Sequence, residues 1–387
     1  MPNSWKRRLP LVTCIFASLR CLLPARAQYI PQGGSRWQGV NGISLPSPGV
    51  GAAVMRGHLF WTNNNGVAWT EITPPGQADQ SMLTFFFLDG AHGWITSMNG
   101  SVDSWDENPQ VHIVRTENGG KTWSPLRFDR ASFDLKYGEI PEALWFVDAR
   151  HGWFQWKVQT SSAFDAGVLF STADGGETWK ELPRPPSGSA FRFHTTEVGW
   201  MVGGGSNQEL YVTHDGGNTW QVVSVPAPAS CQECLRNYDV PRFRNVNDGV
   251  LVTTFLDYGD THTGERISST YVTHNGGKSW QSIEDFEETG PDIPTGLVSP
   301  LNGHVIRVLP PSEKTWVQIR NGSNTIASLV PAGLNPRGYI ITGSSFVDDL
   351  NGWLLYGADA RSDLLATTDG GKTFKIITPR LSPTSFK

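Results

Sequence analysis

The chain has 387 residues, and 42 of them are Gly, 26 are Pro and 16 are Trp. Charged residues make up only 17%, against about 25% in an average soluble domain, and the formal net charge is −5. This composition argues against a coiled coil, a helical bundle, a disordered chain and a basic nucleic-acid binder.

The first residues resemble a secretory signal peptide. Lys6, Arg7 and Arg8 precede an apolar stretch over residues 9–23, and Ala25-Arg26-Ala27 fits an A-x-A cleavage pattern. We therefore expect a signal peptide over residues 1–27 and an exported protein, periplasmic or secreted, without a membrane span. Removal of residues 1–27 leaves 26 basic against 36 acidic residues, a net charge of −10.

One motif recurs along the rest of the chain at intervals of 41 to 60 residues. The full copies are TENGGKTW, TADGGETW, THDGGNTW, THNGGKSW and TTDGGKTF, and weaker copies are TNNNGVAW and RNGSNTI. Each copy predicts a β-hairpin turn, because Asp or Asn accepts hydrogen bonds from the turn backbone and Gly supplies positive φ. The seven turn residues are Asn64, Asn118, Asp174, Asp215, Asn275, Asn321 and Asp369.

A second repeated pattern, a column of aligned apolar and Gly positions, supports a count of seven units. An apolar residue, in most copies Phe, precedes a Gly by six positions, and Trp follows that Gly in four copies, as in Phe87…Gly93-Trp94. Each unit of about fifty residues then contains four short strands, which is typical of a β-propeller blade. The sequence thus predicts an all-β fold: a single seven-bladed β-propeller of four-stranded antiparallel blades over residues 28–387.

The T-x-D-G-G-x-T-W copies resemble Asp-box (bacterial neuraminidase) repeats. Together with the F-x-D-x-x-x-G-W column, they most resemble propellers of the photosystem II stability and assembly factor type. The resemblance covers nearly all of residues 37–380 and implies a non-catalytic scaffold that binds another protein. Related repeats occur in sialidases, xyloglucan-cleaving enzymes and sortilin-type receptors, so the motif defines fold more than function.

Two surfaces are candidates for binding. The segments that join strands B to C and D to A vary strongly in length, so one face could bind a protein or a glycan; they could also be insertions without a partner. The second candidate is the channel face of the inner strands, where the neighbours of the Phe column alternate away from the core. Arg192, His194, Arg242 and Arg244 would form a positive patch there, suited to carboxylate or phosphate, unless Glu197, Asp239 and Asp248 pair with it. Trp105 and Trp145 fall outside the repeat columns and are further binding candidates.

The alternative function is a sialidase-like or glucanase-like glycosidase. A sugar carboxylate could be bound by Arg192, Arg242, Arg307 and Arg337, and the nucleophile could be Tyr339 or Tyr356. A carboxylate pair could come from Asp103, Asp106 and Glu107. Cys231 and Cys234 are expected to form a small loop disulfide. No cofactor, metal site or nucleic-acid partner is expected, and we expect a monomer.

Overall fold

The computed structural model describes part of the chain in detail. The described residues are 40–76, 80–99, 111–128, 139–159, 165–256, 266–288, 304–308, 317–321, 324–329, 340–358 and 361–379. The expected signal peptide, Trp105 and most of the long loops lie outside these ranges.

The strands form separate antiparallel sheets, each built from consecutive segments of the chain. Numbered by repeat unit, blade 1 contains β1 (Val40–Ser47), β2 (Val50–Met55), β3 (His58–Thr62) and β4 (Thr70–Glu71). Blade 2 contains β5 (Gln80–Phe87), β6 (Gly93–Asn99), β7 (Val111–Thr116) and β8 (Ser124–Leu126). Blade 3 contains β9 (Glu139–Phe146), β10 (Gly152–Gln159), β11 (Asp165–Thr172) and β12 (Lys180–Glu181). Blade 4 contains β13 (Phe191–Phe193), β14 (Gly199–Gly203), β15 (Glu209–Thr213) and β16 (Gln221–Val223), with the 3-10 turn η2 (Gly205–Asn207) before β15.

The later units follow the same order with two departures. Blade 5 has five strands: β17 (Leu235–Tyr238), β18 (Arg242–Phe243), β19 (Gly249–Leu256), β20 (Arg266–Thr273) and β21 (Gln281–Glu288), preceded by the 3-10 turn η3 (Ala229–Cys231). Unit six contributes three described strands: β22 (His304–Val308), β23 (Val317–Asn321) and β24 (Asn324–Leu329). Blade 7 contains β25 (Ile340–Phe346), β26 (Gly352–Ala358), β27 (Arg361–Thr367) and β28 (Lys375–Ile376).

The expectation of seven four-stranded blades therefore needs correction. Six units form blades of four or five strands, and unit six is a three-stranded sheet among the described residues. Its copy of the motif, RNGSNTI, lacks both the Gly-Gly pair and the closing aromatic residue. In its place Asn321 pairs directly with Asn324 across a tight hairpin.

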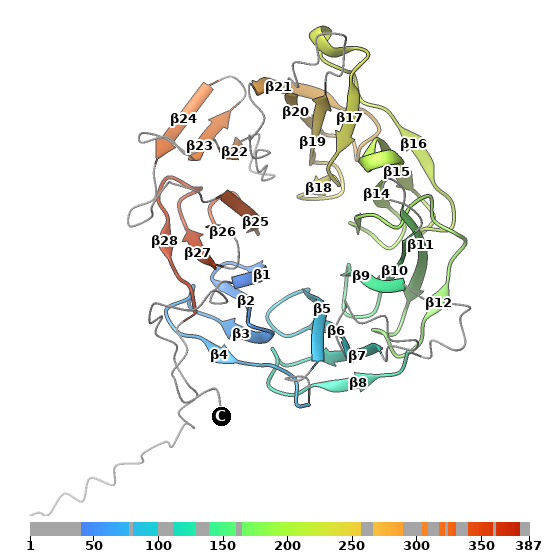
Figure 1. The fold of residues 1–387 in the computed structure, drawn as a ribbon, viewed down its shortest axis with the longest axis vertical. Helices are drawn as coiled ribbons and strands as arrows, with labels where there is room; N and C mark the ends of the chain where they lie inside the picture. The colour runs from blue at the N-terminus through green and yellow to red at the C-terminus, as the bar shows by residue number, and fades with distance from the viewer. Residues whose placement is uncertain are drawn as a thin grey trace, which may run out of the picture.

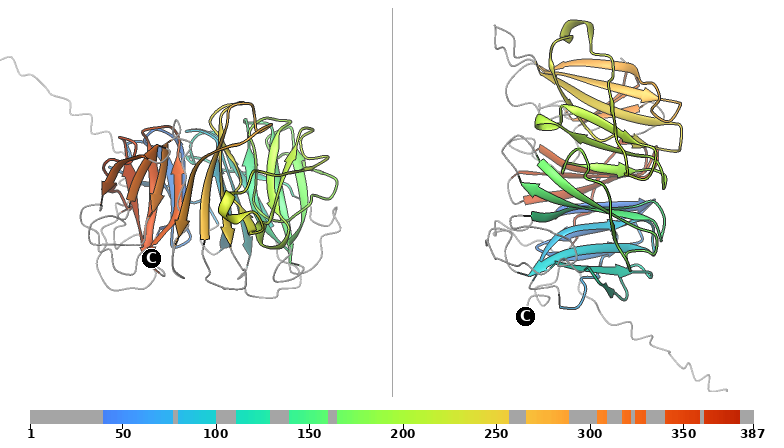
Figure 2. Two further views of the ribbon diagram at one scale, coloured as in Figure 1. Left: turned by 90° about the horizontal axis from the view of Figure 1, so that it is seen from above. Right: turned by 90° about the vertical axis from the view of Figure 1, so that its right-hand side faces the viewer.

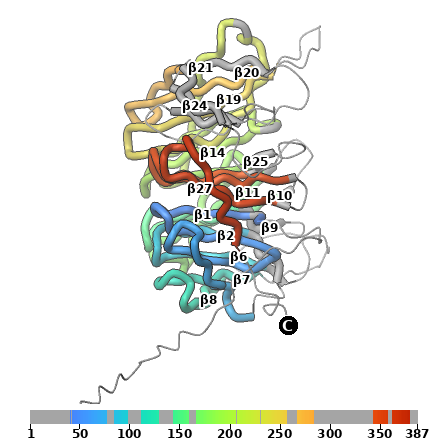
Figure 3. The backbone as a smooth tube through the Cα atoms, turned by 90° about the vertical axis from the view of Figure 1, so that its left-hand side faces the viewer, coloured from blue at the N-terminus to red at the C-terminus, as the bar shows by residue number. Residues whose placement is uncertain are grey.

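The sheets surround a central axis with their first strands innermost, as β1, β5, β9 and β25 show in Figure 1. Seen from the edge, the strands run between the two faces of the ring (Figure 2). Blades 1 and 7 meet where the ring closes (Figure 3). Among the described residues, the sheets of these two blades share no strand. Trp69 Nε1 donates to the Ile377 carbonyl at 3.1 Å and Trp353 Nε1 donates to Asn65 Oδ1 at 3.1 Å.

The repeated turns share one hydrogen-bond pattern. In blade 2 the Thr116 hydroxyl donates to Asn118 Oδ1 at 3.1 Å and accepts the Gly120 N–H at 2.8 Å, while Asn118 Oδ1 also accepts the Thr122 N–H at 2.9 Å. Gly119 and Gly120 have φ of 67° and 79°, which Gly adopts without strain. The same pattern recurs at Asn64, Asp174, Asp215, Asn275 and Asp369.

The Phe and Gly columns depend on each other. The ring of Phe87 lies on Gly93 so closely that a Cβ atom there would be 2.5 Å from it. The same contact occurs in blades 3, 4, 5 and 7. The following Trp crosses to the next blade: Trp94 stacks on Phe146 with centroids 3.6 Å apart, and its Nε1 donates to the Gly175 carbonyl at 2.9 Å. The repeat therefore specifies contacts between blades as well as the turns within them.

Candidate functional site

A cavity of about 790 Å³ lies at the centre of the ring, lined by the innermost strands. Its walls come from residues 43–46, 85–88, 144–146, 192–194, 241–244 and 344–347, together with Trp200. These segments are the A strands and the starts of the A–B loops of six blades. Side chains alternate along a strand, and neighbours of the Phe column such as Phe86, Trp145 and Arg192 line this cavity, together with residues of the column itself such as Phe193.

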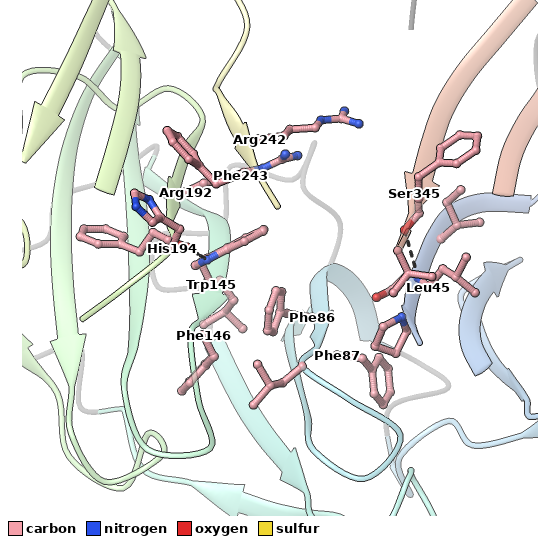
Figure 4. Close-up of a pocket in the computed structure, with 18 of the residues that line it drawn as sticks. Leu45, Phe86, Phe87, Trp145, Phe146, Arg192, His194, Arg242, Phe243 and Ser345 are labelled. Carbon is pink, nitrogen blue, oxygen red and sulfur yellow. Dashed lines mark hydrogen bonds between the residues drawn. The ribbon is translucent and has the colours of Figure 1, made fainter. Parts of the chain in front are cut away.

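Charge is distributed unevenly around the cavity. Arg192, His194, Arg242 and Arg244 lie on the wall formed by blades 4 and 5, and none of the described lining residues is acidic. The opposite wall, from blades 7 and 1, is neutral; there the Leu45 N–H donates to Ser345 Oγ at 3.1 Å. Figure 4 shows Arg192 and Arg242 on one side of the cavity, and Leu45 with Ser345 on the other.

An aromatic surface from blades 2 and 3 supports Arg192. The Arg192 guanidinium lies 5.3 Å from the centre of the Trp145 ring, within cation–π range. Trp145 is itself fixed, because its Nε1 donates to the Phe193 carbonyl and its ring lies 5.0 Å from that of Phe86. The guanidinium therefore lies against an aromatic face, and the charge of Asp239 also acts on it.

Two arginine charges are close enough to repel each other. Burial, with a contribution from the neighbouring Arg242 charge, lowers the pKa of Arg192 to about 9. Burial also lowers the pKa of Arg242, and Asp239 opposes this change. Burial raises the pKa of Asp239 in turn, against the effect of the two arginines. With a pKa of about 9, Arg192 remains charged at neutral pH, so an anion beside it would relieve the repulsion from Arg242.

His194 extends the same wall. Its ring stacks on Phe243 with centroids 4.3 Å apart, and its buried Nδ1 has no hydrogen-bond partner among the described residues. Burial, and secondarily the nearby His214, lowers the pKa of His194, which favours the neutral ring. His194 therefore presents a polar group to the cavity without adding charge at neutral pH.

Arg244 has a partner that the sequence did not indicate. Its Nη1 lies 3.2 Å from Asp349 Oδ2 in blade 7, and its charge also acts on Asp248, one of the acidic residues considered from the sequence. Asp349 follows the loop residue Asp348, in the same column as Asp89 and Asp148. Residues of that column accept hydrogen bonds from the backbone of the A–B loops; Asp89 Oδ1, for example, accepts two backbone N–H groups. This local pattern does not indicate a contact between separate units.

The other predicted residues are placed as follows. Cys231 and Cys234 form a disulfide with Cα atoms 5.2 Å apart, in the segment before blade 5. Tyr356 is buried at 1% exposure in blade 7 and does not line the cavity. Trp105, Asp103, Asp106, Glu107, Arg337 and Tyr339 lie outside the described residues, and only the backbone of Arg307 is described. The described residues contain no cluster suited to a metal ion and no helix long and apolar enough to cross a membrane.

Several solved structures of low sequence identity are similar to this chain. YCF48 bound to D1 peptide is 19% identical and covers 77% of this chain and 82% of its own, with a TM-score of 0.44. YCF48 from Cyanidioschyzon merolae is 17% identical over 83% of this chain and 90% of its own, with a TM-score of 0.47. An ancestral GH74 enzyme is 12% identical over 91% of this chain and 48% of its own, with a TM-score of 0.51.

The chain has a β-propeller fold. A family model described as Sortilin-Vps10 (sortilin, neurotensin receptor 3) matches residues 167–289, less than half of the chain. No curated protein matches the sequence. At these identities the likeness to solved structures concerns the fold, and the propeller carries different activities in different proteins.

Proposed function

We propose that this propeller is an exported, non-catalytic binding or assembly module that holds an anionic group of a protein partner in its central cavity. The observation that carries the proposal is the buried Arg192 guanidinium over the Trp145 ring, with Arg242 on the same cavity wall, whose described lining residues include no acidic side chain. Arginine forks match carboxylate and phosphate geometry, and both are compact anions that protein segments carry.

The proposal also includes the fold and the export of the chain. All seven units would close one ring, the repeated turns would be Asp boxes, and the chain would be exported after cleavage near Ala27. In this arrangement the turns and the Phe-Gly-Trp contacts stabilise the ring, so the residues of the cavity wall can differ from one unit to the next. The variable loop face, with Trp105, would contact the remainder of the partner around the cavity.

The test is binding of a capped tetrapeptide by isothermal titration calorimetry. The one-carboxylate probe is acetyl-Asn-Gly-Gly-Asp-amide, and its control is the same peptide with Asn in place of Asp. We expect only the acidic probe to bind, and Arg192→Gln to weaken it by about tenfold or more, since hydrogen bonds to charged groups contribute about 1.5–3 kcal/mol.

Arg150→Gln is the matched control, because Arg150 is an exposed arginine outside the cavity whose Nε donates to the Ala173 carbonyl. It removes the same charge and should leave the affinity unchanged. Equal binding of both peptides, or equal loss in both variants, would contradict the proposal. Hydrolysis of fluorogenic sialosides or β-glucans that disappears in Arg242→Ala would favour the glycosidase instead.

A further inference from the structure

One strand position changes its chemistry from blade to blade around the cavity. In each blade that lines the cavity, the residue before the apolar column pairs with the residue after the Gly of that column, as Phe86 pairs with Trp94. The equivalent residues, all of which line the cavity, are Ser44, Phe86, Trp145, Arg192, Arg242 and Ser345. This position is therefore aromatic in blades 2 and 3, cationic in blades 4 and 5, and a small serine in blades 7 and 1.

The fold does not require an aromatic side chain at this position. Ser44 and Ser345 occupy it in blades 1 and 7, and the strand pairing is the same there. The neighbouring column position, by contrast, has a ring in blades 2 and 7 alike, against Gly93 and Gly352. Apolar surface in contact with water is unfavourable. The rings at the cavity-facing position therefore indicate a contact that the repeat itself does not need.

Three residues, Phe86, Leu88 and Trp145, form the aromatic wall of the cavity. The rings of Phe86 and Trp145 lie 5.0 Å apart. Phe86 and Leu88 also pack against the core between blades 2 and 3. All three residues nevertheless remain partly exposed, so the aromatic wall offers apolar surface to a ligand in the cavity.

The aromatic wall lies directly beside the Arg192 guanidinium, which is 5.3 Å from the centre of the Trp145 ring. Figure 4 shows Phe86, Trp145 and Arg192 in succession along the cavity. The two ring distances together span about three extended residues of a peptide. The cavity volume of about 790 Å³ falls within the range of about 300–1,000 Å³ for ligand pockets. A short peptide segment can therefore contact Arg192 and the aromatic wall at the same time.

We propose that the aromatic wall is a subsite for a large apolar side chain within two positions of the anionic group in a bound peptide segment. This inference rests on the proposed function, and it names the ligand as an acidic segment with an adjacent aromatic or large aliphatic residue. Asp239 also acts on the charge of Arg192. The apolar contact does not depend on how that charge is balanced, because burial of apolar surface contributes affinity by itself.

The test compares the one-carboxylate probe with two aromatic probes, acetyl-Asn-Gly-Phe-Asp-amide and acetyl-Asn-Phe-Gly-Asp-amide, by calorimetry. We expect the better aromatic probe to bind the wild type about tenfold more tightly than the one-carboxylate probe, equivalent to about 1.4 kcal/mol. Phe86→Ser introduces the residue that blades 1 and 7 have at this position. It should lower this affinity ratio about three- to tenfold, and Phe86→Leu should retain most of it.

Two further variants make the result specific. Ile376→Ser is the matched control, because Ile376 is a 45% exposed apolar residue on β28, outside the cavity; it should leave the ratio unchanged. Leu88→Ser removes another part of the aromatic wall and should lower the ratio about threefold. Thermal melts check that each variant folds, and Leu88→Ser decides the question if Phe86→Ser does not fold.

The inference is overturned if the aromatic probes bind the wild type no more tightly than the one-carboxylate probe, or if Phe86→Ser lowers all affinities equally. Binding of sialyllactose in place of the peptides, with the same loss in Phe86→Ser, would assign the wall to a sugar and also overturn it. Failure of the proposed function is distinct. In that case the wild type would not bind the one-carboxylate probe, or Arg192→Gln would bind it as well as the wild type.

Discussion

The boundary between blades 3 and 4 and the boundary between blades 4 and 5 use the same repeat but differ in packing. At the first, Trp153 stacks on Phe193 with centroids 3.6 Å apart and planes 1° apart, and its Nε1 donates to the Gly216 carbonyl at 2.9 Å. At the second, Trp200 lies 5.8 Å from Phe243, and no described residue accepts a hydrogen bond from its Nε1.

The looser packing occurs on the arginine-bearing wall of the cavity. Phe243 is stacked by His194 as well as by Trp200, and both Trp200 and His194 line the cavity. The wall that carries the arginines is therefore the place where the repeat relaxes. Aromatic residues at the regular boundary should determine stability, and aromatic residues of the cavity wall should determine binding.

The largest expected effect contrasts the two tryptophans. Trp153→Ala should lower the free energy of unfolding by about 3–5 kcal/mol, as for other large core truncations. Trp200→Ala should cost about 1 kcal/mol less, because Trp200 lacks the hydrogen bond and the close stack. Denaturant titration of both variants measures the difference, and equal losses would show that the two boundaries are equivalent.

A smaller effect tests the Phe-Gly contact at a regular boundary. Gly93→Ala would place a Cβ 2.5 Å from the buried Phe87 ring, so the ring must shift, at a cost of about 1–3 kcal/mol. Gly90 in the adjoining loop is the control; a Cβ there would be 3.7 Å from Val50, an ordinary contact. Gly90→Ala should change stability by less than about 0.5 kcal/mol. An equal loss of stability in both variants would contradict the explanation that the Phe87 ring requires Gly at position 93.

The cavity wall should behave in the opposite way. Trp145→Ala removes the ring beneath Arg192. It should lower the affinity for the one-carboxylate probe about three- to tenfold, in the range of a cation–π contact. Trp145→Phe keeps an aromatic face and should retain most of the affinity. Calorimetry with thermal melts separates binding from folding; unchanged affinity in a folded Trp145→Ala protein would show that the ring does not position Arg192.

The smallest effect concerns the repeated turn, tested at Asp174 in blade 3. Burial raises the pKa of Asp174, but hydrogen bonds from Thr178 and Thr172 outweigh it, so the pKa lies below 3.8 in the folded protein. The folded state is then favoured above pH 3.8, and this contribution is lost as the pH falls through the folded-state pKa. Asp174→Asn should keep the turn, as Asn118 does in blade 2. The unfolding free energy of the wild type should therefore fall more steeply than that of the variant below pH 3.8; parallel curves would contradict this.

The sequence predicted the repeat well, because each turn and each Phe-Gly-Trp column is a local pattern. Alternation along a strand also predicted that Arg192, His194, Arg242 and Arg244 face the channel, and they line the cavity; the cavity is lined as well by residues of the Phe column that was expected in the core. It could not predict that Asp349 is the partner of Arg244, because that contact depends on how three units pack. Nor did it predict the three-stranded sheet of unit six, although the missing Gly-Gly pair in RNGSNTI was the available signal.

The most direct test of the central claim is a crystal structure of the protein with the one-carboxylate probe. The account predicts the carboxylate between the guanidinium groups of Arg192 and Arg242, within hydrogen-bond distance of both. A probe bound on the outer surface of the ring, with the cavity arginines unchanged, would contradict it.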